Sequence, residues 1–249
     1  MLSQSDIVSI RTFEKGSALV VNGNSFMING MNWDMIPIGK DAVNTNFWNK
    51  PDELIKAGLE SEMSLLKEMN VNAIRHYSDI PSKWVQYIFE NYGIYTMLNH
   101  SFGRYGLTIN GVWEPITDYS NDDTQKVLLS EIKTLVNKYK NTPGLLLYLL
   151  GNENNYGLFW SGAETEDFPE EESKKEAVGE KYGRPMYKLM NMAAKKIKEL
   201  ELEKEVFIGN HSHAHGYLVD LKNQSFINDI DTSSLIFKER LGYNPIFFS

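Results

Sequence analysis

The sequence predicts an α/β fold, a (β/α)8 TIM barrel that is incomplete on its C-terminal side. Three observations lead to this fold class. Apolar segments of strand length alternate with segments of helical periodicity, which is typical of parallel sheets built from βαβ units. The chain has 249 residues, close to the length of about 250 that one such barrel needs. Several strands also end in an abrupt change from apolar to polar residues, and such ends converge on one mouth in a barrel.

The elements are expected in the following order along the chain. Residues 19–28 predict a hairpin, because Asn22-Gly23 is a strong turn signal between two apolar runs. Strands are expected at 29–34, 71–77, 93–100, 145–150 and 206–210, with weaker ones at 227–231 and 243–249. Helices are expected at 51–69, 81–92, 123–139 and 184–200.

This order divides the chain into an N-terminal extension, residues 1–18, and a barrel, residues 19–249, that stops near its seventh strand. A doubly wound open sheet would give a similar alternation of elements. However, no Gly-x-Gly-x-x-Gly follows any expected strand, which removes support from a dinucleotide-binding fold.

Composition excludes several classes of partner. The formal net charge of −8 argues against nucleic acid and anionic membranes, since both require concentrated Lys and Arg. No apolar run is long enough to predict a membrane span. The absence of cysteine rules out disulfides, thiolate zinc sites and cysteine nucleophiles. Residues 1–16 show no signal peptide, so we expect either an intracellular protein or one whose leader has been removed.

Glu153 is the strongest catalytic candidate. It comes just after the apolar segment 145–150 and is flanked by Asn152 and Asn154, so it leaves the sheet at a strand end. The functional interpretation is a partly buried general acid, and the alternative is a carboxylate that caps the next helix. Glycoside cleavage usually needs a second carboxylate. Asp34 ends another strand, with loop anchoring as an equally good explanation.

Other residues near the strand ends are candidates for substrate binding. Arg75 lies in an expected parallel strand, where an unpaired charge is costly, so we expect it to pair with a carboxylate at the mouth. A purely structural ion pair is the alternative. Aromatic faces stack on sugar rings, although packing is the better explanation for any single aromatic residue. The predicted substrate-binding set is Asn152, Arg75, Trp33, Asp34, Asn99, His100, Tyr156 and Trp160.

Three histidines at alternate positions, His211, His213 and His215, would share one face of an extended strand. Three imidazoles could bind zinc. An exposed polar loop is the preferred explanation, because no matching carboxylate motif accompanies them. We therefore expect no metal and no cofactor.

From Leu19 to about Leu221 the chain resembles the catalytic barrel of glycoside hydrolase family 2, within the wider clan of retaining barrel glycosidases. The matching segments are residues 29–34, 72–75, 98–100 and 151–153, and Gly151-Asn152-Glu153 is the most specific of them. The resemblance implies a glycosidase acting on β-galactosides, β-glucuronides or β-mannosides by a retaining double displacement. It also implies that Glu153 is the acid/base, that Asn152 contacts the sugar 2-hydroxyl, and that Arg75 supports the nucleophile.

The sequence departs from the family pattern at both ends. About 18 residues stand where family members usually carry β-sandwich domains. The family nucleophile is a Glu after the seventh strand, and residues 244–249 resemble that strand. We therefore expect the nucleophile beyond Ser249, and a chain that is weakly active or inactive on its carbohydrate substrate. The alternatives are a non-catalytic carbohydrate-binding remnant and, with less support, a metal hydrolase using the histidines.

Overall fold

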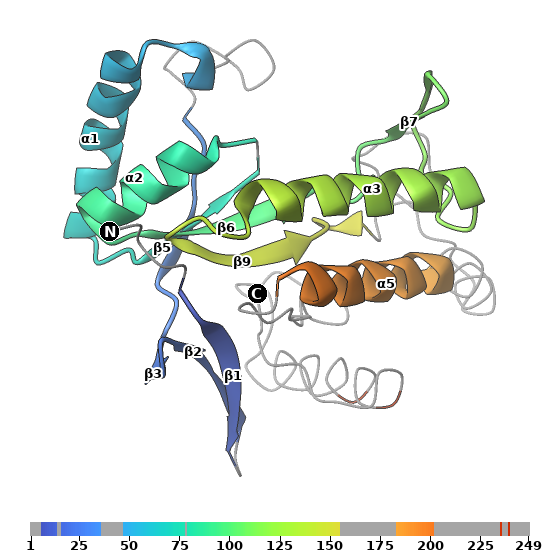
Figure 1. Cartoon of the computed structure of the whole chain (residues 1–249), viewed down its shortest axis with the longest axis horizontal. Helices are drawn as coiled ribbons and strands as arrows, with labels where there is room; N and C mark the ends of the chain where they lie inside the picture. The colour runs from blue at the N-terminus through green and yellow to red at the C-terminus, as the bar shows by residue number, and fades with distance from the viewer. Residues whose placement is uncertain are drawn as a thin grey trace, which may run out of the picture.

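The computed structural model describes residues 6–13, 16–35, 47–77, 79–154 and 183–201, together with Leu235 and Glu239. Four parallel strands form the central sheet in the order β4-β5-β6-β9, which is also their order along the chain. Their bounds are Gly30–Asn32, Ala73–His76, Tyr95–His100 and Leu145–Leu150. Figure 1 shows β6 and β9 pointing the same way beneath the helices. Each strand pairs with the next along the chain, as in a TIM barrel.

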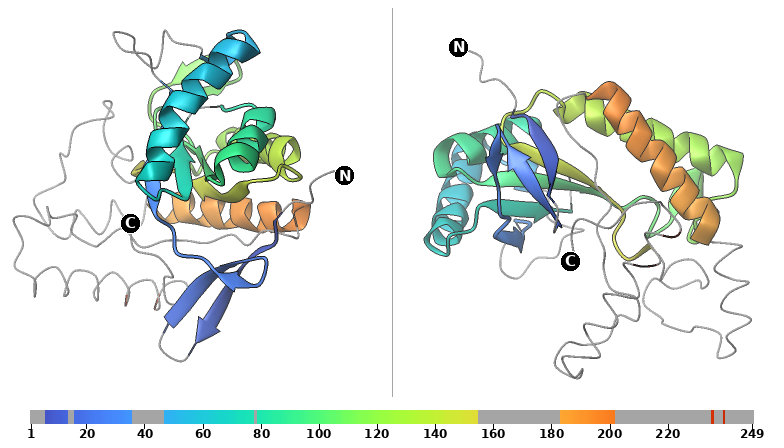
Figure 2. Two further views of the ribbon diagram at one scale, coloured as in Figure 1. Left: turned by 90° about the vertical axis from the view of Figure 1, so that its left-hand side faces the viewer. Right: turned by 90° about the horizontal axis from the view of Figure 1, so that it is seen from below.

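Within the described ranges that end at residue 201, four α-helices connect or follow these strands, and all four were predicted. Their bounds are α1 Asp52–Glu68, α2 Ser82–Tyr92, α3 Asp122–Tyr139 and α5 Arg184–Leu200, with a short 3₁₀ helix, η1, at Phe47–Asn49. Both views in Figure 2 place α3 and α5 side by side. None of the described helices is long and apolar enough to cross a membrane. The strands expected at 206–210, 227–231 and 243–249 lie outside the described residues.

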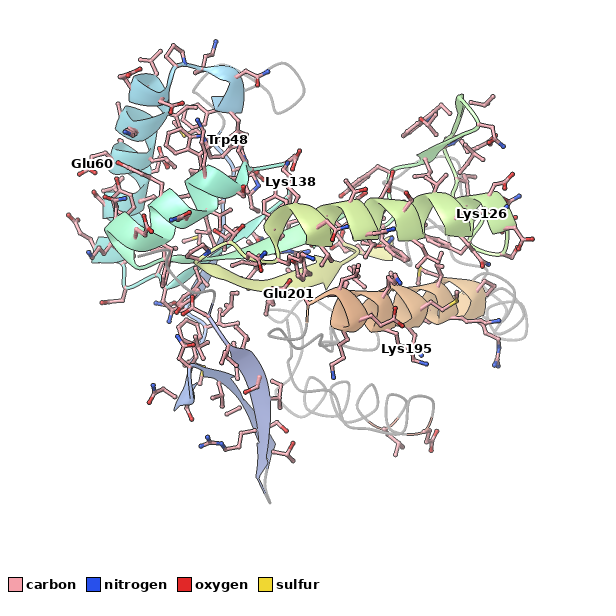
Figure 3. All side chains as sticks on the ribbon, viewed as in Figure 1. Trp48, Glu60, Lys126, Lys138, Lys195 and Glu201 are labelled. Carbon is pink, nitrogen blue, oxygen red and sulfur yellow. The ribbon has the colours of Figure 1, made fainter. Side chains whose placement is uncertain are left out.

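The two faces of the sheet are packed by different elements. Ile74, Leu98 and Tyr148 belong to a core cluster that also contains the buried faces of the four helices. Tyr148 also donates a hydrogen bond of 2.6 Å to Glu201, which lies at the end of α5 below β9 (Figure 3). Ala73, one residue before Ile74, belongs to a second cluster. Because strand side chains alternate between faces, the sheet has an outer face under the helices and an inner face opposite.

A three-stranded antiparallel sheet covers the N-terminal end of the inner face. It consists of β1 Val8–Phe13, β2 Gly16–Val21 and β3 Asn24–Ser25. Its buried side chains, Val8, Leu19 and Val21, pack in one cluster with Ala73 and Met97. Figure 2 shows this small sheet beside the strands of the central one. It therefore closes the inner face opposite the mouth with apolar side chains.

The predicted hairpin at 19–28 is confirmed, because β2 and β3 pair across Asn22 and Gly23, whose φ values are +49° and +83°. Positive φ at both positions is what a type I′ turn requires. Strand β1 was not predicted. The expected boundary between residues 18 and 19 falls inside β2, and β1 pairs with β2 from Val8↔Val21 to Phe13↔Gly16.

A second hairpin, also not predicted, follows β6. Strands β7 Leu107–Ile109 and β8 Val112–Glu114 pair across Asn110-Gly111, which again has positive φ at both residues. The Asn110 amide donates to Asp123 at 3.2 Å and so ties the turn to the first residues of α3. Figure 1 shows this hairpin on the side to which β6 and β9 point.

The apolar small sheet should contribute to the stability of the whole fold. Leu19 is 2% exposed in the inner-face cluster, so Leu19→Ala should lower the free energy of unfolding by about 2–5 kcal/mol. Ile7→Ala is the matched control, because Ile7 is 53% exposed and should change stability by less than about 0.5 kcal/mol. Urea denaturation followed by circular dichroism measures both. Equal, small effects would show that the small sheet is not part of the core.

Candidate functional site

Side chains from three strand ends meet on the inner face. Arg75 belongs to β5, Asn99 to β6, and Asn152 follows β9 by two residues. Arg75 Nη2 lies 2.7 Å from Asn99 Oδ1 and 3.0 Å from Asn152 Oδ1. Arg75 Nε lies 3.1 Å from Asn99 Oδ1. The three residues therefore form one hydrogen-bonded cluster at the carboxyl ends of the strands, as the apolar-to-polar pattern predicted.

The described partners of Arg75 are uncharged. Within the described ranges its hydrogen bonds go to the amide oxygens of Asn99 and Asn152, and the Tyr77 ring lies 4.5 Å from the guanidinium carbon. These amide oxygens accept from Nε and Nη2 but carry no charge. Among the described residues Arg75 forms no ion pair, so the carboxylate partner expected from the sequence stays a prediction.

Glu153 lies in a tight turn at the edge of this cluster. Gly151 has φ of +94° and Glu153 has φ of +51°, which is uncommon for a residue other than glycine. The Glu153 side chain is exposed, which corrects the expectation that it is partly buried. The charge of Glu153 still acts on Tyr77. Burial raises the pKa of Tyr77, the positive charge of Arg75 lowers it, and the nearby Glu153 raises it further.

The buried side chain of Asn154 holds this turn in place. Its Nδ2 donates to the carbonyl oxygens of Ser101 and Phe102 and to the Tyr119 hydroxyl, each at 3.0 Å. Its Oδ1 accepts from the backbone N–H of Asn152 at 2.7 Å. One amide thus joins the turn after β9 to the loop after β6.

Two neighbours of Asn154 show how tight this packing is. A Cβ atom on Gly151 would collide with Asn154 Oδ1, so the turn needs glycine there. Burial raises the pKa of Tyr119 to about 12, although the Asn154 hydrogen bond and Arg104 act in the opposite direction. The Tyr119 hydroxyl therefore stays protonated and donates to Phe102 O at 2.7 Å.

Asp34 and Trp33 occupy structural positions behind the cluster. Asp34 Oδ1 lies 3.1 Å from Nε2 of the fully buried His76, and Asp34 Oδ2 accepts from the Tyr77 N–H at 3.4 Å. Trp33 is 7% exposed and packs against Trp48 and His76 at centroid distances of 6.3 and 5.8 Å. These positions match the alternatives weighed from the sequence, loop anchoring for Asp34 and packing for Trp33.

His100 lies on the opposite face from Asn99, which corrects their expected placement in one binding set. Adjacent strand residues point to opposite faces, and Asn99 occupies the inner one. The His100 ring faces α3, with Nε2 3.4 Å from Glu131 Oε2, and Nδ1 accepts from the Phe102 N–H at 3.1 Å. Tyr156, Trp160 and the three histidines at 211–215 lie outside the described residues.

Two aromatic residues at the mouth were not predicted. The Tyr105 hydroxyl lies 3.2 Å from Asn152 Nδ2, and Tyr77 lies over Arg75. Tyr77 is the last residue of the strand expected at 71–77, so its position could have been found from the sequence. Tyr105 follows β6 by five residues and could not. In the part of the chain that the structure describes, no three His, Asp or Glu side chains are grouped so as to hold a metal ion.

A parallel sheet with polar side chains gathered at the carboxyl ends of its strands is what a TIM barrel presents at its mouth, and comparison with known proteins gives the family. Residues 13–164, more than half of the chain, match the model for glycosyl hydrolases family 2, TIM barrel domain. The chain therefore belongs to glycoside hydrolase family 2.

Similar proteins are considerably longer than this chain. A β-galactosidase of Lactococcus lactis is 30% identical over 148 residues, which cover 58% of this chain and 13% of that protein. A β-galactosidase of Leuconostoc mesenteroides is 27% identical over 154 residues, covering 60% and 13%. Among solved structures, β-glucuronidase 3 of Bacteroides uniformis aligns with a TM-score of 0.49 and 19% identity over 79% of this chain and 20% of that one. The chain thus spans about 13% of the length of these β-galactosidases.

The Asn154 hydrogen bonds lead to a prediction about pH. In Asn154→Asp an oxygen replaces Nδ2 and faces the three oxygens that Nδ2 now contacts. Burial and loss of these hydrogen bonds should raise the pKa of the new carboxyl above the value of about 3.9 in the unfolded chain. The variant should therefore be closest to wild type below that pH and lose stability as pH rises through the folded-state pKa.

Urea denaturation between pH 4 and pH 8 measures this effect. We expect a deficit of about 2–4 kcal/mol at neutral pH, which shrinks on acidification. Asn154→Leu is the control, since it breaks the same hydrogen bonds without adding a titratable group and should show a deficit independent of pH. A deficit in Asn154→Asp that does not change with pH would contradict the described role of Nδ2.

Proposed function

We propose that this chain carries the acid/base part of a retaining glycosidase site, with Glu153 as the acid/base and a carbohydrate as substrate. The observation that carries this proposal is the position of Glu153, one residue after an Asn152 side chain that is hydrogen-bonded to Arg75 on the inner face. Family 2 membership supports it. β-Galactosides and β-glucuronides are the first substrates to test, since the similar proteins are named for them.

The cluster has the polar groups that a sugar ring needs. Arg75 donates to Asn152 Oδ1, which fixes the orientation of that amide and leaves Asn152 Nδ2 as a donor. Nδ2 now donates to the exposed Tyr105 hydroxyl, which is both donor and acceptor. A sugar hydroxyl inserted here can accept from Asn152 and exchange a hydrogen bond with Tyr105, and the 2-hydroxyl is the assignment that the family resemblance favours.

Glu153 would act twice in the reaction. In the first step its carboxyl proton passes to the glycosidic oxygen as the bond to the anomeric carbon breaks and a second carboxylate attacks that carbon. In the second step the Glu153 carboxylate takes a proton from water as the water oxygen attacks the anomeric carbon and releases the second carboxylate. The exposed position of Glu153 suits exchange of the proton with solvent.

The second carboxylate should lie about 5–5.5 Å from the first. Asp34 is a poor candidate, because its oxygens are engaged by buried His76 and by the Tyr77 N–H. We infer that the nucleophile belongs to a part of the barrel outside the described residues and lies near Arg75, whose positive charge would keep it ionised. Glu153 alone can donate a proton but cannot trap the anomeric carbon, so turnover should be weak wherever this nucleophile is lacking.

Glu153→Gln tests the acid/base role directly. It should lower kcat on 4-nitrophenyl β-galactoside, β-glucuronide or β-mannoside by about 10²–10⁴-fold, while the dissociation constant of the methyl glycoside changes by less than about threefold. The loss should be smaller with a dinitrophenyl leaving group, which needs less protonation. Glu68→Gln, which changes an exposed carboxylate at the end of α1, is the control and should keep wild-type rates.

The binding measurement distinguishes the two readings of the site. Calorimetry of the methyl glycosides should show binding that Arg75→Met weakens by at least about tenfold, because that variant releases Asn152 and removes the positive charge. Sugar binding that depends on Arg75, with no turnover of any aryl glycoside, would favour the non-catalytic carbohydrate-binding function. Turnover that survives Glu153→Gln unchanged would reject Glu153 as the acid/base.

A further inference from the structure

The loop after β6 carries two large exposed aromatic side chains beside the cluster. Tyr105 is 54% exposed and Trp113, on β8, is 58% exposed. Gly106 connects them, since it follows Tyr105 in the chain and the Trp113 indole lies directly against it, where a Cβ atom would collide with the ring. The indole thus lies against Gly106, and the side chain remains largely open to solvent. We call Tyr105 and Trp113 the aromatic ledge.

The aromatic ledge is continuous with the candidate site. The Tyr105 hydroxyl lies 3.2 Å from Asn152 Nδ2, and Asn152 in turn contacts Arg75. The contacts therefore run from Arg75 on the inner face to Asn152 and Tyr105, and the next residue in the chain, Gly106, lies against Trp113 on the hairpin. A ligand seated over Asn152 would have the ledge as its next surface outward.

The ledge is also held rigidly by the rest of the loop. Leu107, next to Gly106, is buried in the outer core, and Asn110 ties the hairpin turn to α3 through Asp123. Thr117 Oγ1 donates to Gly103 O at 2.6 Å and closes the base of the loop. A rigid aromatic surface loses little conformational entropy when a ligand binds.

We propose that the aromatic ledge binds a second sugar ring, so that the ligand of this site is an oligosaccharide rather than a glycoside of one sugar. This inference rests on the carbohydrate site proposed above. A pyranose ring has an apolar C–H face that packs on an aromatic ring, and hydroxyls at its edge that need polar neighbours. Trp113 offers the aromatic face, and the Tyr105 hydroxyl beside the amide cluster offers a hydrogen bond.

The size and setting of the ledge favour a sugar over a protein partner. A stable protein interface buries about 800 Å² on each side, and two aromatic side chains on a three-residue strand and its loop supply only a part of that. The contact of Tyr105 with Asn152 also places this end of the ledge beside the proposed sugar site. An extended glycan uses both features, since one ring lies over the amide cluster and the next over the indole.

Fluorine NMR of protein labelled with 5-fluorotryptophan locates the second ring. The chain has 5 tryptophans, and the resonance missing from Trp113→Phe identifies Trp113. Methyl β-galactoside, methyl β-glucuronide and methyl β-mannoside provide one ring, and the corresponding β-linked disaccharides and trisaccharides provide more. Methyl glycosides are required, because an aryl group could itself stack on the indole. We expect the Trp113 resonance to shift with the disaccharide and to stay unchanged with the methyl glycoside.

Affinities measured by calorimetry give the second readout. In the wild type the disaccharide should bind about five- to tenfold more tightly than the methyl glycoside, and Trp113→Ala should remove this gain while leaving methyl glycoside binding within about twofold. Val112→Ala is the matched control. Val112 precedes Trp113 on the same strand, is 60% exposed, and points to the opposite face of the hairpin, so it should keep the gain.

The outcomes separate this inference from the function on which it rests. If the methyl glycosides bind in a manner that depends on Arg75 but Trp113→Ala leaves the disaccharide gain intact, the ledge is not a sugar subsite and the proposed function stands. Equal weakening of both ligands would place the indole in the first subsite and also reject a second-ring role. If no sugar of the three series binds, the carbohydrate site is rejected and the ledge with it.

Discussion

The arrangement of the mouth depends on one buried amide, the side chain of Asn154. An amide presents a donor and an acceptor in one rigid plane, and here the donor holds the loop after β6 while the acceptor holds the backbone of Asn152. A carboxylate lacks the donor, and an aliphatic side chain lacks both. Because the two loops meet through this group, the distances from Asn152 to Arg75 and to Tyr105 are set together. The tight turn at Gly151 and the left-handed backbone of Glu153 are the local cost of that arrangement.

The alternation of side chains along the strands then divides the polar residues between two environments. Arg75 and Asn99 face inward, whereas their neighbours His76 and His100 face the helices and contact Asp34 and Glu131. The polar residues at a strand end therefore have two roles. Those that face inward line the mouth, and those that face outward contact the surrounding loops and helices. The inner face also changes character along the strands. The small antiparallel sheet covers its N-terminal end with apolar side chains, and the polar cluster lies at the opposite, C-terminal end.

Much of this fold could be predicted from the sequence because the signals are local. The strand at 145–150 is a continuous apolar run, and the helices carry strong 3.6-residue periodicity. The β7–β8 hairpin was missed although its Asn110-Gly111 turn is the same signal that located Asn22-Gly23, and Val8–Phe13 alternates apolar and polar residues as a strand does. The roles of Asn154 and Tyr105 could not be predicted, since they depend on which loops meet in space. The burial of Trp33 likewise follows from the packing of Trp48 and His76 around it.

Among the described residues Arg75 is hydrogen-bonded by uncharged amides, and this bears on how such a site would work. A retaining mechanism needs one carboxylate ionised and one protonated at the same pH, which requires unequal electrostatic surroundings. Asn99 and Asn152 keep the guanidinium fixed without competing for its charge. A carboxylate brought against Arg75 would therefore be held ionised, as a nucleophile must be. Were Arg75 already paired with an aspartate or glutamate, the same position would repel a nucleophile. The two amide partners of Arg75 among the described residues are thus consistent with a site whose charge is completed by a carboxylate from another part of the barrel.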